Sequence, residues 1–410
     1  MIRSFQFRCR PTKAQTAALT DIVFKKQAIY NAALEQRIAA YRRWRIHHHK
    51  NPDWSAPTAK GYRPKKSLGF YDQDADLKII RKEQPEYAAF LQRIPRLALK
   101  DLDLAFKAFF RRIKAGEKPG FPRFRSSFRD RQTLKLGEGM KWRKGKGEFA
   151  HIKFHGLPGK LRFKIHNPKF AGDDVTVKTT MLTRDHKGWL VTFQCELPGV
   201  QMQDVADSIG IDVGIEKFLA TDEGETIPNP RALDKELKTL RRKQRALSRK
   251  KRGGGNRQRA RKNVARLHAH IRNARKNFHC ETAAWLAAKG KTIVVENLNI
   301  KGLSRGMLAR QVNDVAWGYF LKRLENKAES AGLRVEKVDP KYTSQVCSGC
   351  GAMVRKSLAV RVHRCDACGL ALDRDHNAAI NIKNKAVASL EGANFGVARS
   401  CPRNLSLALQ

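Results

Sequence analysis

The stretch SIGIDVGI, residues 208–215, predicts a buried β-strand that carries an acid, Asp212. A charge in an apolar strand is unfavourable unless another group pairs with it. Gly210 and Gly214 flank the acid, and glycine allows another backbone or a ligand to come close. The alternative is an aspartate at a strand end that faces solvent, and this strand alone does not decide between the two.

Strands and helices alternate in the second half of the chain. KFLATDEGETI (217–227) predicts a hairpin partner for the first strand, and KTIVVENL (291–298) predicts a second buried strand. Helices are expected between residues 234 and 290 and from Val312 to Ala331, and LRVEKVDP (333–340) is expected to be a third strand. This alternation indicates an α/β domain.

The first half combines strands and helices differently. Residues 1–11 alternate apolar and polar side chains and predict one strand, which we expect to pair with strands predicted between residues 133 and 197. Apolar residues at helical spacing predict helices over 12–41 and 97–113, whereas residues 42–68, with several prolines, are expected to form a loop. This half is therefore expected to be an all-β sheet that carries a helical insertion.

Further acids occupy positions similar to that of Asp212. Glu296 closes the apolar run TIVVE, and Asp373 and Asp375 lie in DRDHNAAIN, where a final helix is expected to begin. The simple structural alternative is that each acid caps a strand or a helix, since aspartate is favoured at helix N-termini. Each acid alone is a weak signal, but the ordered set is a strong one.

The chemistry of these acids indicates a metal site. Carboxylates are the ligands that Mg²⁺ or Mn²⁺ prefers. Two such cations a few ångströms apart activate water and stabilise the leaving oxygen during attack on phosphate. The acids therefore predict a metal-dependent site for phosphodiester hydrolysis.

Basic residues outnumber acidic ones by more than two to one. The 410 residues include 83 Lys and Arg against 38 Asp and Glu, a formal charge of +45, and 41% are hydrophobic, enough for two or more domains. Such a chain repels itself and normally works beside a large anion, for which nucleic acid is favoured over a membrane surface. No apolar run is long enough to span a bilayer, and residues 1–10 do not resemble a signal peptide, so a cytoplasmic protein is expected, or a nuclear one in a cell with a nucleus.

The positive charge is concentrated between residues 235 and 276, with 18 Lys or Arg and the single acid Glu236. A solvated face is the alternative, but intrahelical pairing needs acids, so the run favours a phosphate backbone as partner. The segment GFPRFRS (120–126) mixes rings and guanidinium groups that suit nucleic acid, although phenylalanines packed in a core explain it equally well. The expected nucleic-acid contacts are Arg241, Arg242, Arg245, Arg249, Lys250, Arg123 and Arg125.

Four of the eight cysteines form two CxxC pairs with fourteen residues between the pairs. Four thiolates predict a closed tetrahedral zinc site, whereas a redox motif needs one pair only. His363 adjoins the second pair and is an alternative ligand. The predicted zinc ligands are Cys347, Cys350, Cys365 and Cys368, and ordinary free thiols are expected at Cys9, Cys195, Cys280 and Cys401.

Several motifs together resemble one family. GIDVG (210–214), VVENL (294–298), the two CxxC pairs and DRDHNAAINI (373–382) are very similar to TnpB, the transposon-encoded RNA-guided nucleases related to type V CRISPR effectors. AFKAFFRR (105–112) and GFPRFRS (120–126) look like the N-terminal half of that family. The resemblance covers nearly the whole chain and is most specific in its last half.

The resemblance implies a nuclease domain of the RuvC type, RNase H-like in fold, with Asp212, Glu296 and Asp375 as catalytic acids. Asp375 is preferred to Asp373, because the family's motif places the acid two residues before an asparagine and Asn377 fits. The implied partners are a guide RNA transcribed from the transposon end and double-stranded DNA cut next to a short adjacent motif, with one protein chain in the RNA complex.

The resemblance also implies a domain order. A split β-barrel wedge domain would occupy residues 1–11 and 126–204 and enclose a helical recognition domain at 12–125. The nuclease domain would occupy 205–342 and 372–390, with an inserted zinc ribbon at 343–371 and a disordered tail at 391–410.

Three other functions remain to be weighed against guided cleavage. An RNA-guided protein that binds without cutting is disfavoured by the intact acids. A transposase that also joins DNA is compatible with three acids on this fold. An RNA binder of the ribosomal or chaperone type explains the charge and leaves the acids unexplained.

Overall fold

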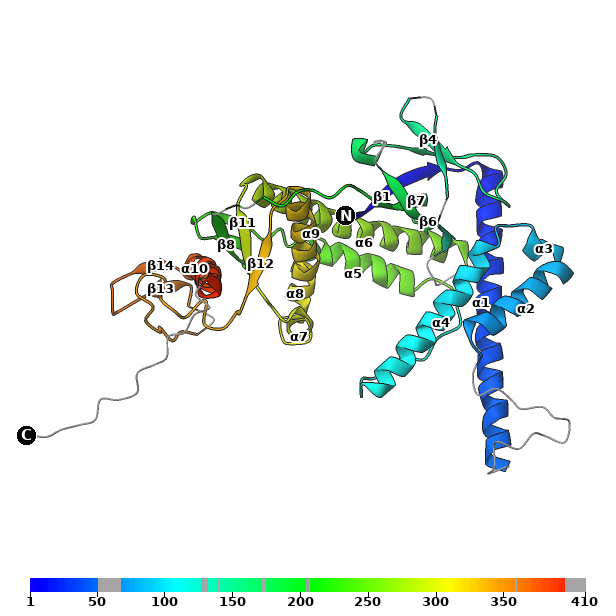
Figure 1. Cartoon of the computed structure of the whole chain (residues 1–410), viewed down its shortest axis with the longest axis horizontal. Coiled ribbons are helices and arrows are strands. Elements are labelled where there is room, and N and C mark those ends of the chain that lie inside the picture. The colour runs from blue at the N-terminus through cyan, green and yellow to red at the C-terminus, as the bar shows by residue number, and fades with distance from the viewer. Residues whose placement is uncertain are drawn as a thin grey trace, which may run out of the picture. The chain divides into compact units, whose positions relative to one another are not determined.

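The computed structural model divides the chain after Gly199 into two compact units, which are described separately (Figure 1). No helix within the described part of the chain is long and apolar enough to cross a bilayer. The described residues are 1–50, 68–126, 132–138, 140–145, 147–170, 175–203, 205, 207–357 and 360–394.

The first unit contains one seven-stranded antiparallel sheet with the order β2-β6-β7-β1-β5-β4-β3. As expected, the first strand pairs with strands from beyond residue 132, lying between β7 and β5. Its alternating side chains place Phe5 and Phe7 in a core that also holds Trp189 and Phe193. The strands are β1 (Ile2–Arg10), β2 (Thr133–Gly137), β3 (Trp142–Lys144), β4 (Phe149–Ile152), β5 (Leu161–Lys164), β6 (Thr176–Asp185) and β7 (Gly188–Glu196).

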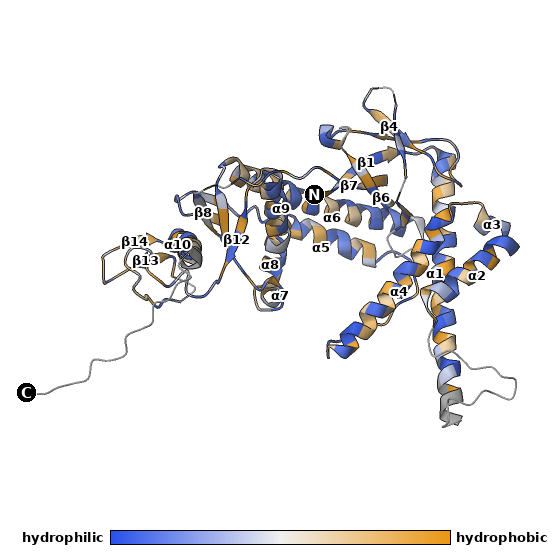
Figure 2. Ribbon diagram, viewed as in Figure 1, coloured by the Kyte–Doolittle hydropathy of each residue, from blue (hydrophilic) through white to orange (hydrophobic). Residues whose placement is uncertain are grey.

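The described residues between β1 and β2 form four helices: α1 (Lys13–Lys50), α2 (Phe70–Glu83), α3 (Pro85–Ala88) and α4 (Arg93–Lys114). Their shared core includes Leu34, Leu77, Leu99 and Leu102. Hydrophilic and hydrophobic residues alternate along α4 in Figure 2, as expected for a helix that buries one face. The predicted helices are confirmed.

The loop predicted from residue 42 is wrong up to residue 50, because α1 continues to Lys50. Residues 42–50 contain neither proline nor glycine, and the prolines that suggested a loop begin at Pro52. The remainder of that prediction, residues 51–67, lies outside the described residues.

The second unit contains a five-stranded sheet with the order β10-β9-β8-β11-β12. β8, β11 and β12 are parallel to one another, and β12 is at one edge of the sheet. On the other side of β8, β9 and β10 form the expected antiparallel hairpin. The strands are β8 (Ser208–Asp212), β9 (Lys217–Thr221), β10 (Thr226–Pro228), β11 (Thr292–Glu296) and β12 (Val335–Val338).

The described helices of this unit are α5 (Ala232–Ser248), α6 (Gly255–Ala288), α7 (Ile300–Leu303), α8 (Ala309–Val315), α9 (Trp317–Ser330) and α10 (Arg374–Asn394), of which α5 packs against α6. Ile209 and Ile293 belong to a core with Leu286 of α6 and Phe320 of α9. Val294, whose side chain points the other way, packs with Ile382 of α10. The sheet is therefore sandwiched between α6 and α9 on one face and α10 on the other (Figure 1).

The single helix predicted from Val312 to Ala331 is wrong, because Ala316 takes a left-handed φ of 54° and separates α8 from α9. Val315 and Trp317 are both buried in the same core. Residues two positions apart point in nearly opposite directions on a straight helix, so burying both against one core requires the break.

The four-cysteine segment lies between β12 and α10 and includes the short strands β13 (Val362–Arg364) and β14 (Ala371–Asp373). The final helix is confirmed. It extends to Asn394, so the tail predicted from residue 391 is wrong for its first four residues, and residues 395–410 lie outside the described part.

Candidate functional site

Asp212 and Glu296 are brought together by the parallel pairing of β8 with β11. Ile211 lies opposite Val295 in this pairing, and each acid is the next residue on its strand. Parallel strands end at the same edge of a sheet. The two carboxylates therefore lie side by side where both strands stop.

Asp375 reaches the same place from α10, which packs across β8. A Cβ on Gly210 would lie 2.2 Å from the carbonyl oxygen of Ala379, so the helix backbone rests directly on the strand. Burial raises the pKa of Asp212 well above its usual range, and the neighbouring charges of Glu296 and Asp375 raise it further. Glu296 and Asp375, from two other elements, are thus close enough to Asp212 for their charges to act on it.

The electrostatics of this cluster indicate an excess of negative charge. Burial also raises the pKa of Glu296, although a hydrogen bond from Thr343 opposes the effect. Burial and the charge of Asp373 raise the pKa of Asp375. Carboxylates that disfavour each other's ionisation are stabilised by a cation between them, so the chemistry of these oxygens suits a hard divalent cation.

Asp373 has a different role, which supports the choice of Asp375. Its Oδ1 accepts backbone hydrogen bonds from Asp375 (3.1 Å) and His376 (3.3 Å), the contacts of a helix N-cap. Its Oδ2 accepts a bond of 2.7 Å from Lys217 Nζ. The capping alternative therefore accounts for Asp373, whose oxygens both have partners.

Sequence reasoning missed the contacts of three polar residues near the acids, although Asn377 had already served to choose Asp375 within its motif. Thr343 Oγ1 donates to Glu296 Oε1 at 2.5 Å. Asn377 and Asn381, one turn apart on α10, hydrogen bond with the backbone of the four-cysteine segment. The signal for the asparagines was their spacing of four on the helix that carries Asp375.

The four cysteines of the CxxC pairs converge, with all four sulfurs within 4.8 Å of one another. The Sγ atoms of Cys347 and Cys368 are 3.6 Å apart, as are those of Cys350 and Cys365. Tetrahedral zinc with Zn–S bonds of ~2.3 Å separates its sulfurs by about 3.8 Å, so the spacing fits. None of these cysteines is in a disulfide.

The surroundings of Cys347 favour its thiolate. Burial opposes ionisation, but the backbone amides of Cys350 and Gly349 and the nearby His363 lower its pKa to about 6. His363, the alternative ligand, is fully buried and its Nδ1 contacts Lys356 Nζ. The four sulfurs form a complete tetrahedral set without it. Cys9, Cys195 and Cys280 are free thiols, as expected, and Cys401 lies outside the described residues.

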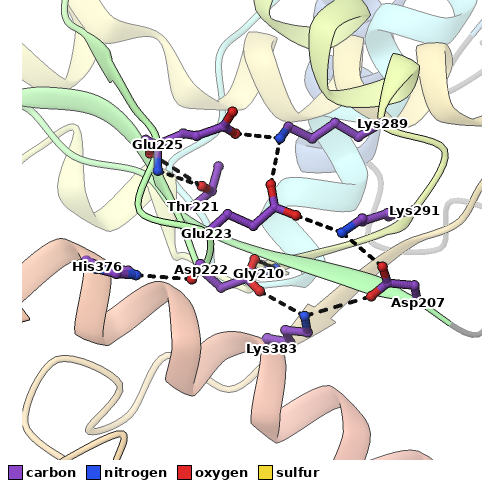
Figure 3. A network of polar contacts seen from close by, with 10 residues as sticks. All are labelled: Asp207, Gly210, Thr221, Asp222, Glu223, Glu225, Lys289, Lys291, His376 and Lys383. Carbon is purple, nitrogen blue, oxygen red and sulfur yellow. Dashed lines mark hydrogen bonds and ion pairs between the residues drawn. The ribbon is translucent and has the colours of Figure 1, made fainter.

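A network of ion pairs lies at the other end of β8 and β11 (Figure 3). Lys291 Nζ contacts Asp207 at 2.9 Å and Glu223 at 2.7 Å, which joins the residues that precede the two strands. Lys383 of α10 contacts Asp222 Oδ2 at 2.9 Å, and Asp222 Oδ1 accepts from the Gly210 amide at 2.9 Å. The network therefore fixes α10 to the strand that carries Asp212.

The predicted nucleic-acid contacts occupy exposed and half-buried positions. Arg241, Arg242, Arg245, Arg249 and Lys250 are all exposed, and no acid pairs with them among the residues that the structure describes. Arg123 is exposed, whereas Arg125 lies 3.9 Å over the ring of Tyr30 and 4.0 Å from Asp101. Phe121 packs edge-on against Phe106 and Phe109 and stays half exposed. The contact agrees with packing in a core, and the exposed half leaves room for stacking on a base.

Two family models match parts of the chain. Residues 193–307 match OrfB_IS605, described as Probable transposase, and residues 317–382 match the model described as Cas12f1-like, TNB domain. The second match contains all four clustered cysteines and Asp375.

Three similar proteins cover different shares of the chain. A protein of Streptomyces pristinaespiralis, named as a candidate RNA-guided DNA endonuclease, is 30% identical over 396 residues, or 94% of this chain and 90% of the relative. InsQ of Escherichia coli (strain K12), named likewise, is 28% identical over 308 residues, or 70% of this chain and 72% of InsQ. The CRISPR-associated endodeoxyribonuclease Cas12f1 of Sulfoacidibacillus thermotolerans is 29% identical over 45% of this chain and 47% of that protein.

A solved structure shares the fold. The cryo-EM structure of a Cas12f1–sgRNA–target DNA complex matches with a TM-score of 0.54 at 17% identity, over 92% of this chain and 84% of that chain. The Streptomyces relative is 30% identical over nearly the full length of both chains, and this similarity agrees with both family models and with the motifs around the acids and cysteines. The chain therefore belongs to the TnpB family, the transposon-encoded relatives of the Cas12f1 nucleases.

Proposed function

We propose that this protein is an RNA-guided DNA endonuclease that cleaves double-stranded DNA next to a short target-adjacent motif by metal-dependent hydrolysis. The observation that carries the proposal is the convergence of Asp212, Glu296 and Asp375 from two parallel strands and a helix. Proteins of this family named as RNA-guided DNA endonucleases support the substrate.

The three carboxylates would hold Mg²⁺ or Mn²⁺. Bound there, the cations would supply an activated water and stabilise the leaving oxygen of the phosphodiester. The chain's own part is to hold one buried and two half-buried acids at one edge of a sheet, with Asp373 and Lys217 fixing the start of the helix that carries Asp375. In this proposal the second unit is an RNase H-like domain of the RuvC type.

The cysteine cluster would bind one structural Zn²⁺ as a zinc ribbon. All four positions of a tetrahedral zinc would be filled by sulfur, which leaves none for catalysis. The ribbon is inserted between β12 and α10, so folding around zinc would set the path of the chain into the helix that carries Asp375.

The first unit would act in nucleic-acid recognition. Its sheet would be the split wedge domain, and α1 to α4 would be the helical recognition insert, since β1 and β2–β7 pair across these helices. Exposed cations of α5 and Arg123 would contact phosphates without reading sequence. The guide RNA would come from the transposon end and bind one chain, and the complex would act in the cytoplasm.

The deciding experiment uses the full chain co-expressed with the RNA of its flanking locus. Plasmids with a guide-matched target beside randomised bases are incubated with the complex in Mg²⁺ and sequenced at the breaks. The test variant is Asp212→Asn. The matched control is Asp373→Asn, which keeps a good helix N-cap two residues from Asp375.

Guide-dependent double-strand breaks that vanish in Asp212→Asn and persist in Asp373→Asn are expected. Occupancy of the same sites without breaks in the unaltered protein would show a guided binding protein instead. Joined DNA products would show a transposase that transfers strands.

A further inference from the structure

Glu296 is a buried acid whose orientation is set by one neighbour. Its side chain is only 9% exposed, and its Oε1 accepts a 2.5 Å hydrogen bond from the Oγ1 of Thr343, which is 4% exposed. The single hydroxyl proton of Thr343 also faces the carbonyl oxygen of Pro340, at 3.1 Å. The shorter distance favours the carboxylate, so this bond restricts rotation of Glu296 about its last torsion and leaves its second oxygen for other partners.

Thr343 is held in place by α10. The Nδ2 of Asn381 donates to the carbonyl oxygens of Thr343 (2.8 Å) and Val346 (2.7 Å). The Nδ2 of Asn377 donates to Val346 at 2.9 Å, and its Oδ1 accepts from the Ser348 amide at 3.0 Å. Both asparagines are buried, so loss of these bonds would leave polar groups without partners.

The backbone before Thr343 is in an uncommon conformation. Tyr342 has a left-handed φ of 63°, which is unfavourable for a residue with a side chain. Its carbonyl oxygen accepts from the amides of Gln345 and Val346, both at 2.9 Å. This turn directs the hydroxyl of the next residue toward Glu296, and such conformations persist where the surroundings fix them.

The same contacts connect the cysteine cluster to the acids. Ser348, which bonds to Asn377, lies between Cys347 and Cys350 in the first CxxC pair. Asn377 and Asn381 lie on the helix that supplies Asp375. One helix therefore carries an acid, holds the first cysteine pair, and places the threonine that contacts a second acid.

We propose that Thr343 is a positioning residue for Glu296, held in its place by Asn381 of α10, which together with Asn377 also holds the first CxxC pair. This inference rests on the proposed function, in which Glu296 is a metal ligand. Groups that hydrogen bond to metal ligands fix their orientation, and their loss typically lowers metal affinity or activity by about 10–100-fold. Thr343 would act on metal affinity and leave nucleic-acid binding unchanged.

The test compares Thr343→Val, which keeps the shape and removes the hydroxyl, with Thr343→Ser, which keeps the hydroxyl. Mn²⁺ binding to the full-length chain free of nucleic acid is measured by electron paramagnetic resonance. The metal dependence of DNA cleavage is then measured with the guide RNA complex. Zinc content and guide RNA affinity are measured for each variant.

We expect Thr343→Val to weaken Mn²⁺ binding and raise the Mn²⁺ midpoint of cleavage about 10-fold or more, with zinc and RNA binding unchanged, and Thr343→Ser to restore both. Equal Mn²⁺ affinity in the valine variant and the unaltered chain would overturn the inference. If the valine variant loses zinc, Mn²⁺ binding is measured on Thr343→Ala instead. Weaker binding than in the unaltered chain then supports the inference, and equal binding overturns it.

Glu296→Gln separates this inference from the function on which it rests. If that variant cuts and binds Mn²⁺ like the unaltered chain, the proposed metal site itself is wrong. If Glu296→Gln is inactive and Thr343→Val is unaffected, the metal site stands and only the positioning role is rejected.

Discussion

Gly210 and Ala379 touch through their backbones, since a Cβ at position 210 would lie 2.2 Å from the Ala379 carbonyl oxygen. This contact brings α10 close enough to β8 for Asp375 to lie near Asp212. A glycine within a strand is unfavourable for the strand itself, and here it is explained by the approach of the helix.

Gly210→Ala is expected to destabilise the second unit by about 1–3 kcal/mol, because the methyl group would overlap backbone that cannot move freely. DNA cleavage should fall further than stability, since displacement of α10 moves Asp375. The matched control is Gly255→Ala, where an added Cβ has no neighbour within 4 Å. Urea unfolding and cleavage rates check both, and equal effects of the two substitutions would contradict the prediction.

Asp222→Ala should lower the free energy of unfolding by about 1–3 kcal/mol. The side chain of Asp222 is 8% exposed and bonds to Lys383 and to the Gly210 amide, so its removal leaves both donors poorly satisfied. Glu225→Ala removes an acid that is 47% exposed from its pair with Lys289, and less than ~1 kcal/mol is expected. The prediction fails if the exposed pair proves as important as the buried one in urea unfolding.

Cys347→Ser should release zinc and lower the thermal stability of the second unit, because such a site contributes folding free energy directly. Cys280→Ser is the control, since that thiol lies outside the cluster. The zinc content of each purified protein is measured by mass spectrometry, and its stability by thermal melting. One zinc per chain retained in Cys347→Ser would argue against the four-thiolate site.

His279 should make stability depend on pH. It is 1% exposed among Phe218, Tyr319 and Phe320, and burial lowers its pKa to about 4. The unfolded chain takes up the proton first as pH falls below ~6.5, so the stability is present above that pH and is lost down to about pH 4. Between pH 6.5 and 5 the loss is about 2 kcal/mol.

His279→Gln should remove this part of the pH dependence. Urea unfolding of both chains at pH 7.5 and pH 5 measures it, because other titrating groups are common to the two. An identical pH effect in the two chains would show that His279 does not titrate between the folded and unfolded states as described.

Replacing Arg241 and Arg245 by glutamine should weaken guide RNA and DNA binding and reduce the slope of log affinity against log salt by about one for each lost phosphate contact. Both side chains are exposed on α5. Lys164 and Lys178 form the control pair, since each contacts an acid at 2.6 Å. Filter binding at several salt concentrations distinguishes the two double variants, and a shared salt slope would mean that α5 does not contact phosphate.

The sequence by itself determined the elements and the residue classes of the site. Alternation in residues 1–11 and the apolar runs ending at Asp212 and Glu296 predicted the strands, because side-chain periodicity is set by local backbone geometry. The spacing of each CxxC pair predicted the cysteine cluster for the same reason, since two thiols on one turn are close in any fold.

The tertiary structure decided the relationships between distant parts of the chain. Thr343 and Glu296 are 47 positions apart, and no local pattern shows that one donates to the other. The break at Ala316 arises because Val315 and Trp317 are buried in the same core. The family motif favoured Asp375 over Asp373 as the catalytic acid, but only the backbone amides at the start of α10 assign the helix cap to Asp373. Local propensities fix strands and helices, whereas which side chains meet depends on packing between elements far apart in the sequence.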